Sequence, residues 1–482
     1  MTHELPANLL QWVLIIVTPL VSFYTAGHAL LYKRDPRAAL GWIAVCLMFP
    51  LAGPLLYLFF GVNRVRTRAR KLRRLTLPLQ FYDERPEVVT SAEVSSLALP
   101  PDFAPLARIG DSVTAKPLVG GNHIEALHNG EEVYPAMLEA IENARRSLYL
   151  TTYIFETNRT GLRFVEALAA AVKRGVDVRV LIDGIGEFYS FPPAGRILRK
   201  RGVQVARFMP PKLLPPTLHI NLRNHRKILI ADGALGFTGG MNIGDRHLTA
   251  DGSRANRVVD IHFRLAGPIV QQMALTFLDD WRFCTGQETA FETMLPPDAG
   301  DGICRVIDDG PNEEMDKLSM ILVGAVSAAG SRVAIVTPYF LPPREMIAAL
   351  QSAALRGVEV MLILPAKNNL PFVHWATRNL LWELLQRGVR VYYQPPPFVH
   401  TKLFLVDHAY VQVGSANLDP RSLRLNFELN VEVLDEAFAR RLLAHVEQIR
   451  RTSHELTLAE LDNRSLALRL RDALAWLFSP YM

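Results

Sequence analysis

Two long uncharged stretches dominate the start of the chain. Residues 5–32 form a run of 28 uncharged residues, and residues 38–63 form a run of 26. Each is longer than the roughly 20 residues that a helix needs to cross a bilayer core. No Lys or Arg precedes Lys33, whereas a secretory signal begins with basic residues. The pattern predicts a retained anchor of two hydrophobic segments, about 9–32 and 38–60, although Pro50 and Pro54 leave open whether the second segment is kinked or re-entrant.

Beyond the anchor, short apolar runs alternate with segments of helical periodicity, and the order occurs twice. LYLTTYIF and VDVRVLID are typical of buried strands, and FVEALAAAVKRG between them repeats apolar residues at helical spacing. VAIVTPYF and VEVMLILP repeat this arrangement further along, with Tyr339 in the place of Tyr153. The alternation of helices with apolar strands predicts a mixed α/β sheet in each half.

The duplication predicts an α/β fold of two pseudo-symmetric lobes, each a mixed sheet flanked by helices, after an N-terminal transmembrane hairpin. We place the anchor in residues 1–64, a basic arm and linker in 65–120, the first lobe in 121–297 and the second in 298–482. The second lobe ends in LALRLRDALAWLF, an amphipathic helix that either packs on its own domain or lies on a membrane.

The net charge of +6 comes from one segment. Residues 61–74 contain seven basic residues and no acidic one, so the remaining residues carry a net charge of −1. A basic arm beside a membrane segment suits anionic headgroups and favours a cytoplasmic location. Lys33, Arg34 and Arg37, between the two segments, oppose that orientation. The nearly neutral remainder is unlike a nucleic-acid binder.

A pattern of chemically active residues occurs once in each half: His-x-Lys, four residues, Asp, six residues, then Gly-Gly/Ser-x-Asn. Its members are His225, Lys227, Asp232, Gly239, Gly240 and Asn242 in the first half, and His400, Lys402, Asp407, Gly414, Ser415 and Asn417 in the second. Alternate residues of a strand share a face, so each His and Lys are expected to point the same way. Asp232 and its counterpart complete the motif near a turn, where we expect a hydrogen-bonding role.

Two imidazoles and two ammonium groups at one phosphate suit the exchange of a phosphodiester without a metal. Imidazole titrates near pH 6.5, so a neutral nucleophile and a protonated acid can coexist near neutral pH. The two lysines would offset the charge on the phosphate oxygens, with Asn242, Ser415 and Asn417 as neutral substrate ligands. A single copy of HxKx4D would be weak evidence, but two copies that each follow a strand–helix–strand unit are specific.

These residues resemble the HKD motifs of the phospholipase D superfamily, and the chain is similar to its bacterial cardiolipin synthases. The likeness covers most of the 482 residues, including GGNHIEALHNGEEVYPAML, HFRLAGPIV, NLDPRSLRLNFELNVEV and the final LFSPYM. The resemblance implies that the two motifs meet in one cleft. It also implies the condensation of two phosphatidylglycerols to cardiolipin and glycerol. Together with the anchor and the basic arm, it leads us to expect a multi-pass protein of the bacterial inner membrane whose lobes are cytoplasmic.

By the same resemblance, His225 attacks the donor phosphorus and His400 serves as acid and base, with the reverse assignment left open. In the family a carboxylate shortly after each motif holds the other ring nitrogen of the histidine. Glu428 follows His400 by 28 residues and Asp260 follows His225 by 35. The resemblance therefore predicts the pairs Glu428–His400 and Asp260–His225, with Asp for Glu and Gly240 for Ser as departures from symmetry.

The motifs leave the acceptor open, because water, phosphatidylethanolamine or a small alcohol would use the same residues as phosphatidylglycerol. The sequence has no P-loop, dinucleotide fingerprint or DGxxAR pattern. The exchange of one diester for another also needs no energy donor. We therefore expect no cofactor and no metal. A nuclease and a non-enzymatic scaffold are disfavoured. The expected partners are the membrane and its anionic phospholipids, phosphatidylglycerol and cardiolipin; the oligomeric state is open.

For some further residues a purely structural interpretation stands alone or beside a functional one. The three cysteines, Cys46, Cys284 and Cys304, lack a CxxC pair and are read as buried thiols. Three arginines near the motifs either bind a second anionic lipid or are solvated: Arg223, Arg226 and Arg421. Three histidines either contact headgroups or have no special role: His219, His247 and His374.

Overall fold

The computed structural model places most of the chain. It describes residues 7–33, 36–61, 103–114, 116–211, 222–250, 256–287, 296–310 and 316–479. They form two compact units, an N-terminal unit within residues 1–71 and a main unit within residues 72–482. Most of the predicted basic arm and linker, residues 65–120, lies outside the described residues, as does His219.

The N-terminal unit begins with a long helix followed by shorter ones. They are α1 (Ala7–Tyr32), α2 (Pro36–Met48), α3 (Ala52–Leu56) and the π-helical turn η1 (Tyr57–Gly61). Among the described helices, one is long and apolar enough to cross a membrane, over Ile15–Tyr32. α2 has 13 residues, or about 20 Å, which is shorter than a bilayer core of roughly 30 Å. The second predicted hydrophobic segment is therefore interrupted after Met48.

Prolines explain this interruption, because a proline has no N–H for a helical hydrogen bond. Pro50 lies in the break and Pro54 lies in α3. The hydroxyl of Ser22, on α1, donates to the Pro50 carbonyl at 3.0 Å, and His28 Nδ1 lies 2.8 Å from Tyr57 Oη. The kinked alternative for the second segment thus fits the structure.

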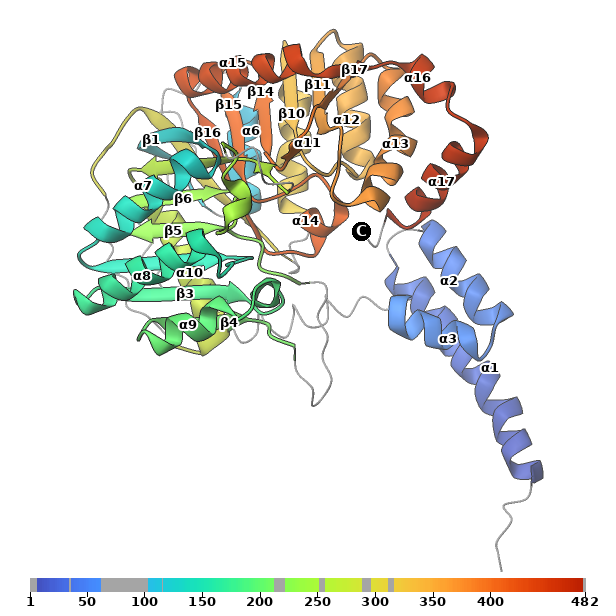
Figure 1. Cartoon of the computed structure of the whole chain (residues 1–482). Coiled ribbons are helices and arrows are strands. Elements are labelled where there is room, and N and C mark those ends of the chain that lie inside the picture. The colour runs from blue at the N-terminus through green and yellow to red at the C-terminus, as the bar shows by residue number, and fades with distance from the viewer. Residues whose placement is uncertain are drawn as a thin grey trace, which may run out of the picture. The chain divides into compact units, whose positions relative to one another are not determined.

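The main unit repeats one order of elements (Figure 1). After α6 (Ala104–Thr114), the first lobe comprises β1 (Val119–His128), α7 (Asn129–Asn143), β2 (Ser147–Thr152), α8 (Arg159–Lys173), β3 (Asp177–Asp183), η4 (Gly186–Tyr189), α9 (Ala194–Lys200), β4 (Gln204–Phe208), β5 (Ile228–Ala231), β6 (Leu235–Gly239), η5 (Asp245–His247), β7 (Val258–Val259), β8 (Ile261–Ala266) and α10 (Ile269–Thr285). The second lobe comprises β9 (Gly302–Asp309), α11 (Lys317–Ala328), β10 (Arg332–Val336), α12 (Arg344–Leu355), β11 (Glu359–Pro365), α13 (Pro371–Leu385), β12 (Arg390–Gln394), β13 (Phe398–Val399), β14 (Leu403–Val406), β15 (Tyr410–Gly414), α14 (Pro420–Arg424), β16 (Glu428–Leu434), α15 (Glu436–Thr452), β17 (His454–Leu456), α16 (Leu458–Asp462) and α17 (Leu466–Leu477).

One continuous sheet runs through both lobes. Its 15 described strands have the order β17-β12-β11-β10-β14-β15-β16-β9-β1-β8-β6-β5-β2-β3-β4. Strands β2, β3 and β4 are parallel, as are β10, β11 and β12, and the other pairs are antiparallel. This confirms the predicted mixed sheets. β1 and β9 pair at the centre, so the order read outward from this pair is nearly the same on either side.

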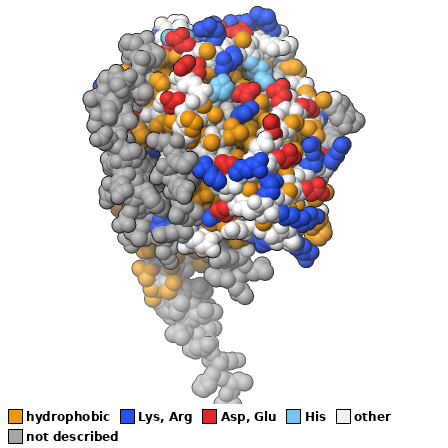
Figure 2. All heavy atoms as spheres, turned by 90° about the vertical axis from the view of Figure 1, so that its left-hand side faces the viewer, with side chains coloured by type: hydrophobic (Ala, Val, Ile, Leu, Met, Phe, Trp, Pro, Cys, Tyr) orange, Lys and Arg blue, Asp and Glu red, His pale blue; other side chains and the backbone are white. Residues whose placement is uncertain are grey.

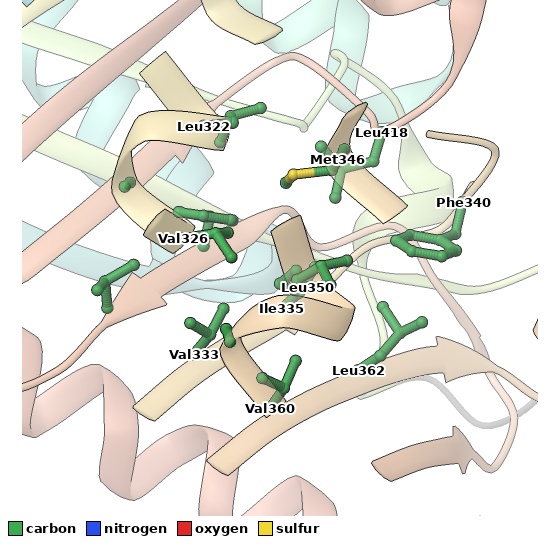
Figure 3. Close-up of a cluster of buried hydrophobic side chains, with 14 of the residues drawn as sticks. Leu322, Val326, Val333, Ile335, Phe340, Met346, Leu350, Val360, Leu362 and Leu418 are labelled. Carbon is green, nitrogen blue, oxygen red and sulfur yellow. The ribbon is translucent and has the colours of Figure 1, made fainter. Parts of the chain in front are cut away.

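Helices cover both faces of the sheet because alternate strand residues point in opposite directions. On β2, Leu148 and Leu150 join the buried cluster formed with α7 and α8, whereas Tyr149 between them stacks on Phe277 of α10 at 4.9 Å. Figure 3 shows the second lobe's core, in which valine, isoleucine and leucine side chains of β10 and β11 meet those of α11 and α12. The buried core thus fixes the position of each strand and of the loops that leave it.

The surface of the main unit is mixed in character. In the face that Figure 2 shows, basic side chains lie beside acidic ones, with hydrophobic side chains scattered between them. Scattered hydrophobic side chains are normal on a protein surface.

Candidate active site

Short strands at the junction of the lobes bring the two motifs together. His225–Lys227 and His400–Lys402 lie just before β5 and β14, and not on these strands as the sequence predicts. β13 pairs with β7 in parallel, and His400 N donates to Val259 O at 2.8 Å. In the same way His225 N donates to Phe427 O at 2.8 Å. The backbone of each histidine is thus held by the other lobe.

The two carboxylates pair with the histidines crosswise, so the predicted pairing was wrong. His225 Nδ1 lies 3.2 Å from Glu428 Oε1. His400 Nδ1 lies 2.9 Å from Asp260 Oδ2. The reason is the pairing of the strands. Val259 pairs with Val399, so the residues that follow them, Asp260 and His400, lie side by side. Asn224 forms a bridge with Phe427, so His225 and Glu428 also lie side by side.

Glu428 is fully buried and its carboxylate has further partners. Its Oε2 accepts a hydrogen bond from the Ser415 hydroxyl at 2.5 Å, and its Oε1 accepts one from Asn426 Nδ2 at 3.3 Å. Ser415 was predicted to bind substrate, but it is fully buried and also accepts from Leu429 N at 3.0 Å. Its position supports Glu428, which in turn orients His225.

The first lobe fills the equivalent space differently. Gly240 stands where the second lobe has Ser415, and a Cβ on Gly240 would lie only 2.6 Å from Asp260 Oδ2. Because the side chain of Asp260 is shorter than that of Glu428, its carboxylate occupies the space that a serine side chain at position 240 would need. Asp260 Oδ1 accepts from Ile261 N at 2.9 Å. The two departures from symmetry therefore compensate for each other.

Both lysines are buried beside their histidines. Lys227 Nζ donates to His225 O at 2.6 Å, and Lys402 Nζ donates to His400 O at 2.6 Å. Lys402 Nζ also lies 3.2 Å from both ring nitrogens of His400. Burial lowers the pKa of Lys227 to about 7 and that of Lys402 to about 8. An anionic phosphate between them would restore their charge.

Burial also acts on the histidines. Burial, followed by the neighbouring Lys227, lowers the pKa of His225, while Glu428 opposes that shift. Burial and Lys402 lower the pKa of His400 well below its usual value. The side chains of His225 and His400 are only 16% and 13% exposed. Both lowered pKa values favour the neutral form of the rings near pH 7.

The motif aspartates hold the chain at the far ends of β5 and β14. Asp232 accepts from the backbone N–H groups of Arg145, Arg146 and Ser147, between 2.7 and 3.2 Å. Asp407 accepts from those of Gly330, Ser331 and Arg332 between 2.7 and 2.9 Å. Both aspartates have a φ of 53° in the left-handed region, which Asp tolerates better than most residues. The hydrogen bonds agree with the role expected of these residues.

The two motif asparagines differ. Asn242 Oδ1 accepts from Ile154 N at 3.1 Å, which fixes the orientation of its amide group. Asn417 is buried and its Nδ2 donates to Ser422 Oγ at 3.3 Å. Hydrogen bonds of this kind position the loops that follow β6 and β15, so contact of either amide with a substrate stays a prediction.

Sequence reasoning missed two tyrosines that flank the site. The Tyr153 ring lies 5.0 Å from the His225 ring, and the Tyr339 ring lies 6.5 Å from the His400 ring. Lys227 Nζ lies 5.7 Å from the centre of the Tyr153 ring. Both tyrosines follow equivalent strands, β2 and β10. The correspondence of Tyr153 with Tyr339 along the sequence was the signal that could have identified them.

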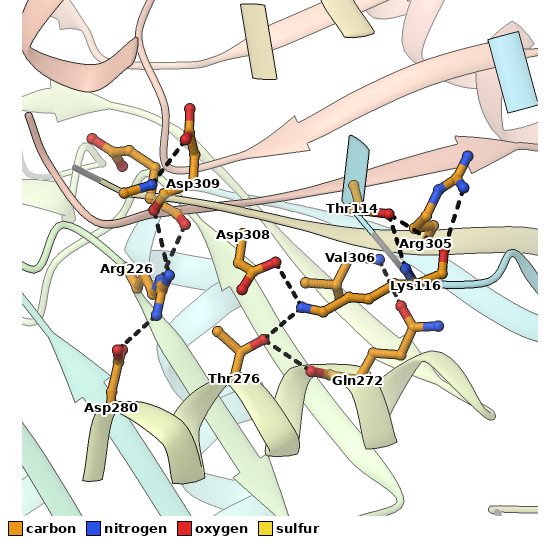
Figure 4. Close-up of polar contacts among 12 residues, drawn as sticks. Thr114, Lys116, Arg226, Gln272, Thr276, Asp280, Arg305, Val306, Asp308 and Asp309 are labelled. Atoms are coloured by element: carbon orange, nitrogen blue, oxygen red, sulfur yellow. Dashed lines mark hydrogen bonds and ion pairs between the residues drawn. The ribbon is translucent and has the colours of Figure 1, made fainter. Parts of the chain in front are cut away.

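Two of the three nearby arginines are buried and paired, which argues against lipid binding by them. Arg223 Nη1 donates to Asp183 Oδ1 at 3.2 Å. Arg226 Nη1 donates to Asp280 Oδ1 at 2.7 Å, and its Nε donates to the Glu428 carbonyl at 3.0 Å. Figure 4 shows Arg226 within a buried polar network that joins α10 to β9. These contacts brace the strand that carries Glu428.

The other candidates contribute less. His247 is buried, and burial lowers its pKa to about 3. His374 lies on α13, with its ring 5.8 Å from that of Tyr393. Within the described residues, no three or more His, Cys, Asp or Glu side chains are grouped to hold a metal. Cys46 and Cys304 are buried free thiols, whereas Cys284 is partly exposed.

Comparison with solved structures identifies the fold. The structure is similar to the phosphatidylserine synthase of Haemophilus influenzae Rd KW20, with a TM-score of 0.60 and 16% identity over 78% of this chain and all of that one. The family described as "Cardiolipin synthase, PLD-like domain" matches residues 137–281 and 322–450, and "Phospholipase_D-nuclease N-terminal" matches 20–61. The fold and the doubled motif thus define a phospholipase D-like protein.

Curated relatives narrow this class. The chain is 31% identical to the major cardiolipin synthase of Bacillus subtilis strain 168, over 93% of this chain and 95% of the relative. It is 33% identical to cardiolipin synthase A of Pseudomonas aeruginosa strain LESB58, over 90% of this chain and 88% of the relative. The chain belongs to the cardiolipin synthase family of phospholipase D-like proteins.

The crosswise pairing predicts which substitution alters which histidine. Diethyl pyrocarbonate modifies neutral imidazole, so its rate of reaction against pH, followed by peptide mass spectrometry, gives the pKa of each ring. Glu428→Gln should lower the pKa of His225 by roughly one unit, because it removes a charge that favours imidazolium, and should change that of His400 less. Asp260→Asn should act mainly on His400. The opposite correspondence would contradict the crosswise contacts.

Proposed function

We propose that this protein is a cardiolipin synthase, which transfers a phosphatidyl group from one phosphatidylglycerol to a hydroxyl of a second and releases glycerol. Relatives of that name align with nearly the whole chain. The observation that carries the proposal is the crosswise contact of each histidine Nδ1 with a buried carboxylate. Because the carboxylates contact the Nδ1 atoms, the two Nε2 atoms are left to act on one phosphate, with Lys402 beside that of His400.

In the proposed first step His225 Nε2 attacks the phosphorus of the donor lipid. A P–N bond forms while the P–O bond to glycerol breaks, and the imidazolium of His400 gives its Nε2 proton to the departing glycerol oxygen. Glu428 stabilises the positive charge that develops on His225, and Asp260 supports the charged form of His400. Binding of the anionic diester favours that charged form, because it offsets the positive field of the two lysines.

In the proposed second step the acceptor phosphatidylglycerol occupies the place of glycerol. Neutral His400 takes the proton of the acceptor hydroxyl as its oxygen attacks phosphorus and the P–N bond breaks. His225 is released in its original form. Lys227 and Lys402 stabilise the charge on the phosphate oxygens in both steps, where removal from water strengthens their effect.

The proposed partners are anionic phospholipids in a bacterial inner membrane. The long apolar helix of the N-terminal unit supports attachment to a bilayer. The basic residues between 61 and 74 support a cytoplasmic position of the main unit. A multi-pass arrangement depends on how the broken second segment enters the bilayer.

Labelled phosphatidylglycerol tests the reaction. Vesicles that contain the protein should yield cardiolipin and free glycerol in equal amounts. His225→Ala and His400→Ala should each lower that rate by roughly a thousandfold or more, because each removes one of the two groups that make and break the bonds. His445→Ala, on α15, should retain the rate, since its ring contacts that of His128 in a tilted arrangement at 4.7 Å and belongs to neither motif. Phosphatidic acid as the sole product would contradict transfer and indicate hydrolysis.

The rate should fall as the pH rises through the range of the lysine pKa values. A lysine is charged below its pKa, and burial lowers those of Lys227 and Lys402 to about 7 and about 8. Since kcat/KM reports the free enzyme, it should decrease above about pH 7. Lys227→Arg should shift this decrease upward, because arginine stays charged throughout. A profile with no alkaline decrease would contradict the role of the lysines.

A further inference from the structure

Many of the large exposed hydrophobic side chains of the main unit lie on two segments. The first, here called the loop patch, consists of Phe188, Tyr189 and Phe191, which are 68%, 56% and 90% exposed. The second, here called the helix patch, is the outer stripe of α17, formed by Leu466, Leu470, Leu474, Leu477 and the adjoining Phe478, all at least half exposed. Contiguous apolar surface of this kind marks a site that contacts a partner or a membrane.

The loop patch stands beside the active site. The Tyr189 ring lies 6.1 Å from that of Tyr153, which itself lies 5.0 Å from the His225 ring. Burial, and after it the neighbouring Tyr189, raise the pKa of Tyr153. Burial also raises the pKa of Tyr339, and Tyr189 again adds to that shift. Tyr189 therefore lies next to the tyrosine that flanks His225.

The helix patch is joined to the site through the second lobe. The Tyr339 hydroxyl donates to Asn369 Oδ1 at 2.7 Å, in the loop that leads into α13. Phe372, at the start of α13, is 42% exposed, and its ring lies 5.9 Å from that of Phe478. The segments that follow the equivalent strands β3 and β11 thus both carry exposed apolar side chains.

Polar contacts on the inner side of α17 fix which face points outward. Asp472 is fully buried and accepts from Arg464 Nη1 at 2.5 Å and from Arg471 Nη2 at 2.6 Å. The Arg471 guanidinium lies 4.4 Å from the centre of the Trp375 ring on α13. Arg378 Nε, on α13, lies 3.5 Å from Asp472 Oδ2, and rotation of α17 would break this contact of a buried carboxylate, which is costly. The leucine stripe is consequently held toward the exterior.

The charges around both patches favour an anionic surface. α9 follows the loop patch and exposes Arg196 and Lys200, with Arg201 exposed just after it; residues 188–203 contain no acidic residue. On α17, Arg469 is exposed beside the leucine stripe, while the helix's single acidic residue is buried. Basic side chains near apolar ones are typical of contact with anionic headgroups.

We propose that the loop patch and the helix patch dock together on the anionic surface of a phospholipid bilayer, so that a lipid headgroup reaches the histidines while its acyl chains stay in the membrane. Both patches belong to the main unit and share no residue with the hydrophobic helix of the N-terminal unit. The proposal rests on the proposed function for its choice of substrate, but the docking itself can be measured without any reaction.

Lipid quenching tests the docking directly. The full chain with Cys284→Ser would carry a polarity-sensitive nitrobenzoxadiazole dye at Phe191→Cys, Leu474→Cys or the control Leu355→Cys, since Cys46 and Cys304 are buried. Leu355 is 67% exposed at the end of α12, outside both patches. In vesicles of equal phosphatidylglycerol and phosphatidylcholine, acyl-chain nitroxides should quench the dye at 191 and 474 at least about threefold more than at 355.

Two results would overturn the proposal. One is equal quenching at the three positions. The other is the absence of quenching by nitroxide lipids together with self-quenching of the dye that decreases when labelled protein is diluted with unlabelled protein. That result would mean that a second copy of the chain covers the patches.

Reaction rates provide the second test. The quantity to measure is the rate on vesicles divided by the rate on monomeric dihexanoyl-phosphatidylglycerol. The double variant Leu470→Ser/Leu474→Ser should lower this ratio about tenfold. The control Leu355→Ser should leave it unchanged. An unchanged ratio in the double variant would contradict docking. If the labelled variants are quenched at 191 and 474 but the wild-type protein makes no cardiolipin, the result would contradict the proposed function and leave docking supported.

Discussion

The site depends on one interaction above all, the crosswise contact of each histidine with a carboxylate from the other lobe. Each lobe supplies a histidine and a lysine but lacks, within itself, the acceptor that orients its own imidazole. The backbone follows the same rule, because each histidine N–H donates to a carbonyl of the other lobe. A single lobe could therefore hold the residues of a motif without holding their geometry. The central β1–β9 pairing and the buried Arg226 keep the two lobes in register around these contacts.

The two halves of the site are nearly symmetric, although different residues form them. In one half a glutamate reaches the histidine and a serine hydroxyl supports its second oxygen; in the other an aspartate fills the space that the serine would need. The result is the same kind of contact at 3.2 and 2.9 Å. The inequality matters for the chemistry, because the two histidines have different tasks in the proposed reaction. Burial of both lysines adds a positive field that an anionic diester neutralises, so substrate binding and protonation of the site are coupled.

Sequence reasoning succeeded where the relevant spacing is local. The turn aspartates and the mixed sheet of each lobe follow from patterns of a few residues, and the structure places them as expected, whereas the His-x-Lys pairs lie just before the strands predicted to carry them. The predicted carboxylate pairs failed because Glu428 lies 203 residues from His225, and no local pattern reveals a contact between lobes. Ser415 and Arg226 were misread for a related reason: their side chains turn into the protein, which depends on what surrounds them in the fold. The acceptor lipid came from family resemblance alone.

Trapping the covalent intermediate tests the central claim most directly. Protein mixed with phosphorus-labelled phosphatidylglycerol and quenched with alkali, which preserves phosphohistidine, should carry the label on the peptide that contains His225. Glu428→Gln should reduce the rate at which this label forms, and His225→Ala should abolish it. A label found on His400 in the wild-type protein, or one that persists in His225→Ala, would contradict the assignment of His225 as the nucleophile. The absence of any labelled histidine would contradict the two-histidine account itself.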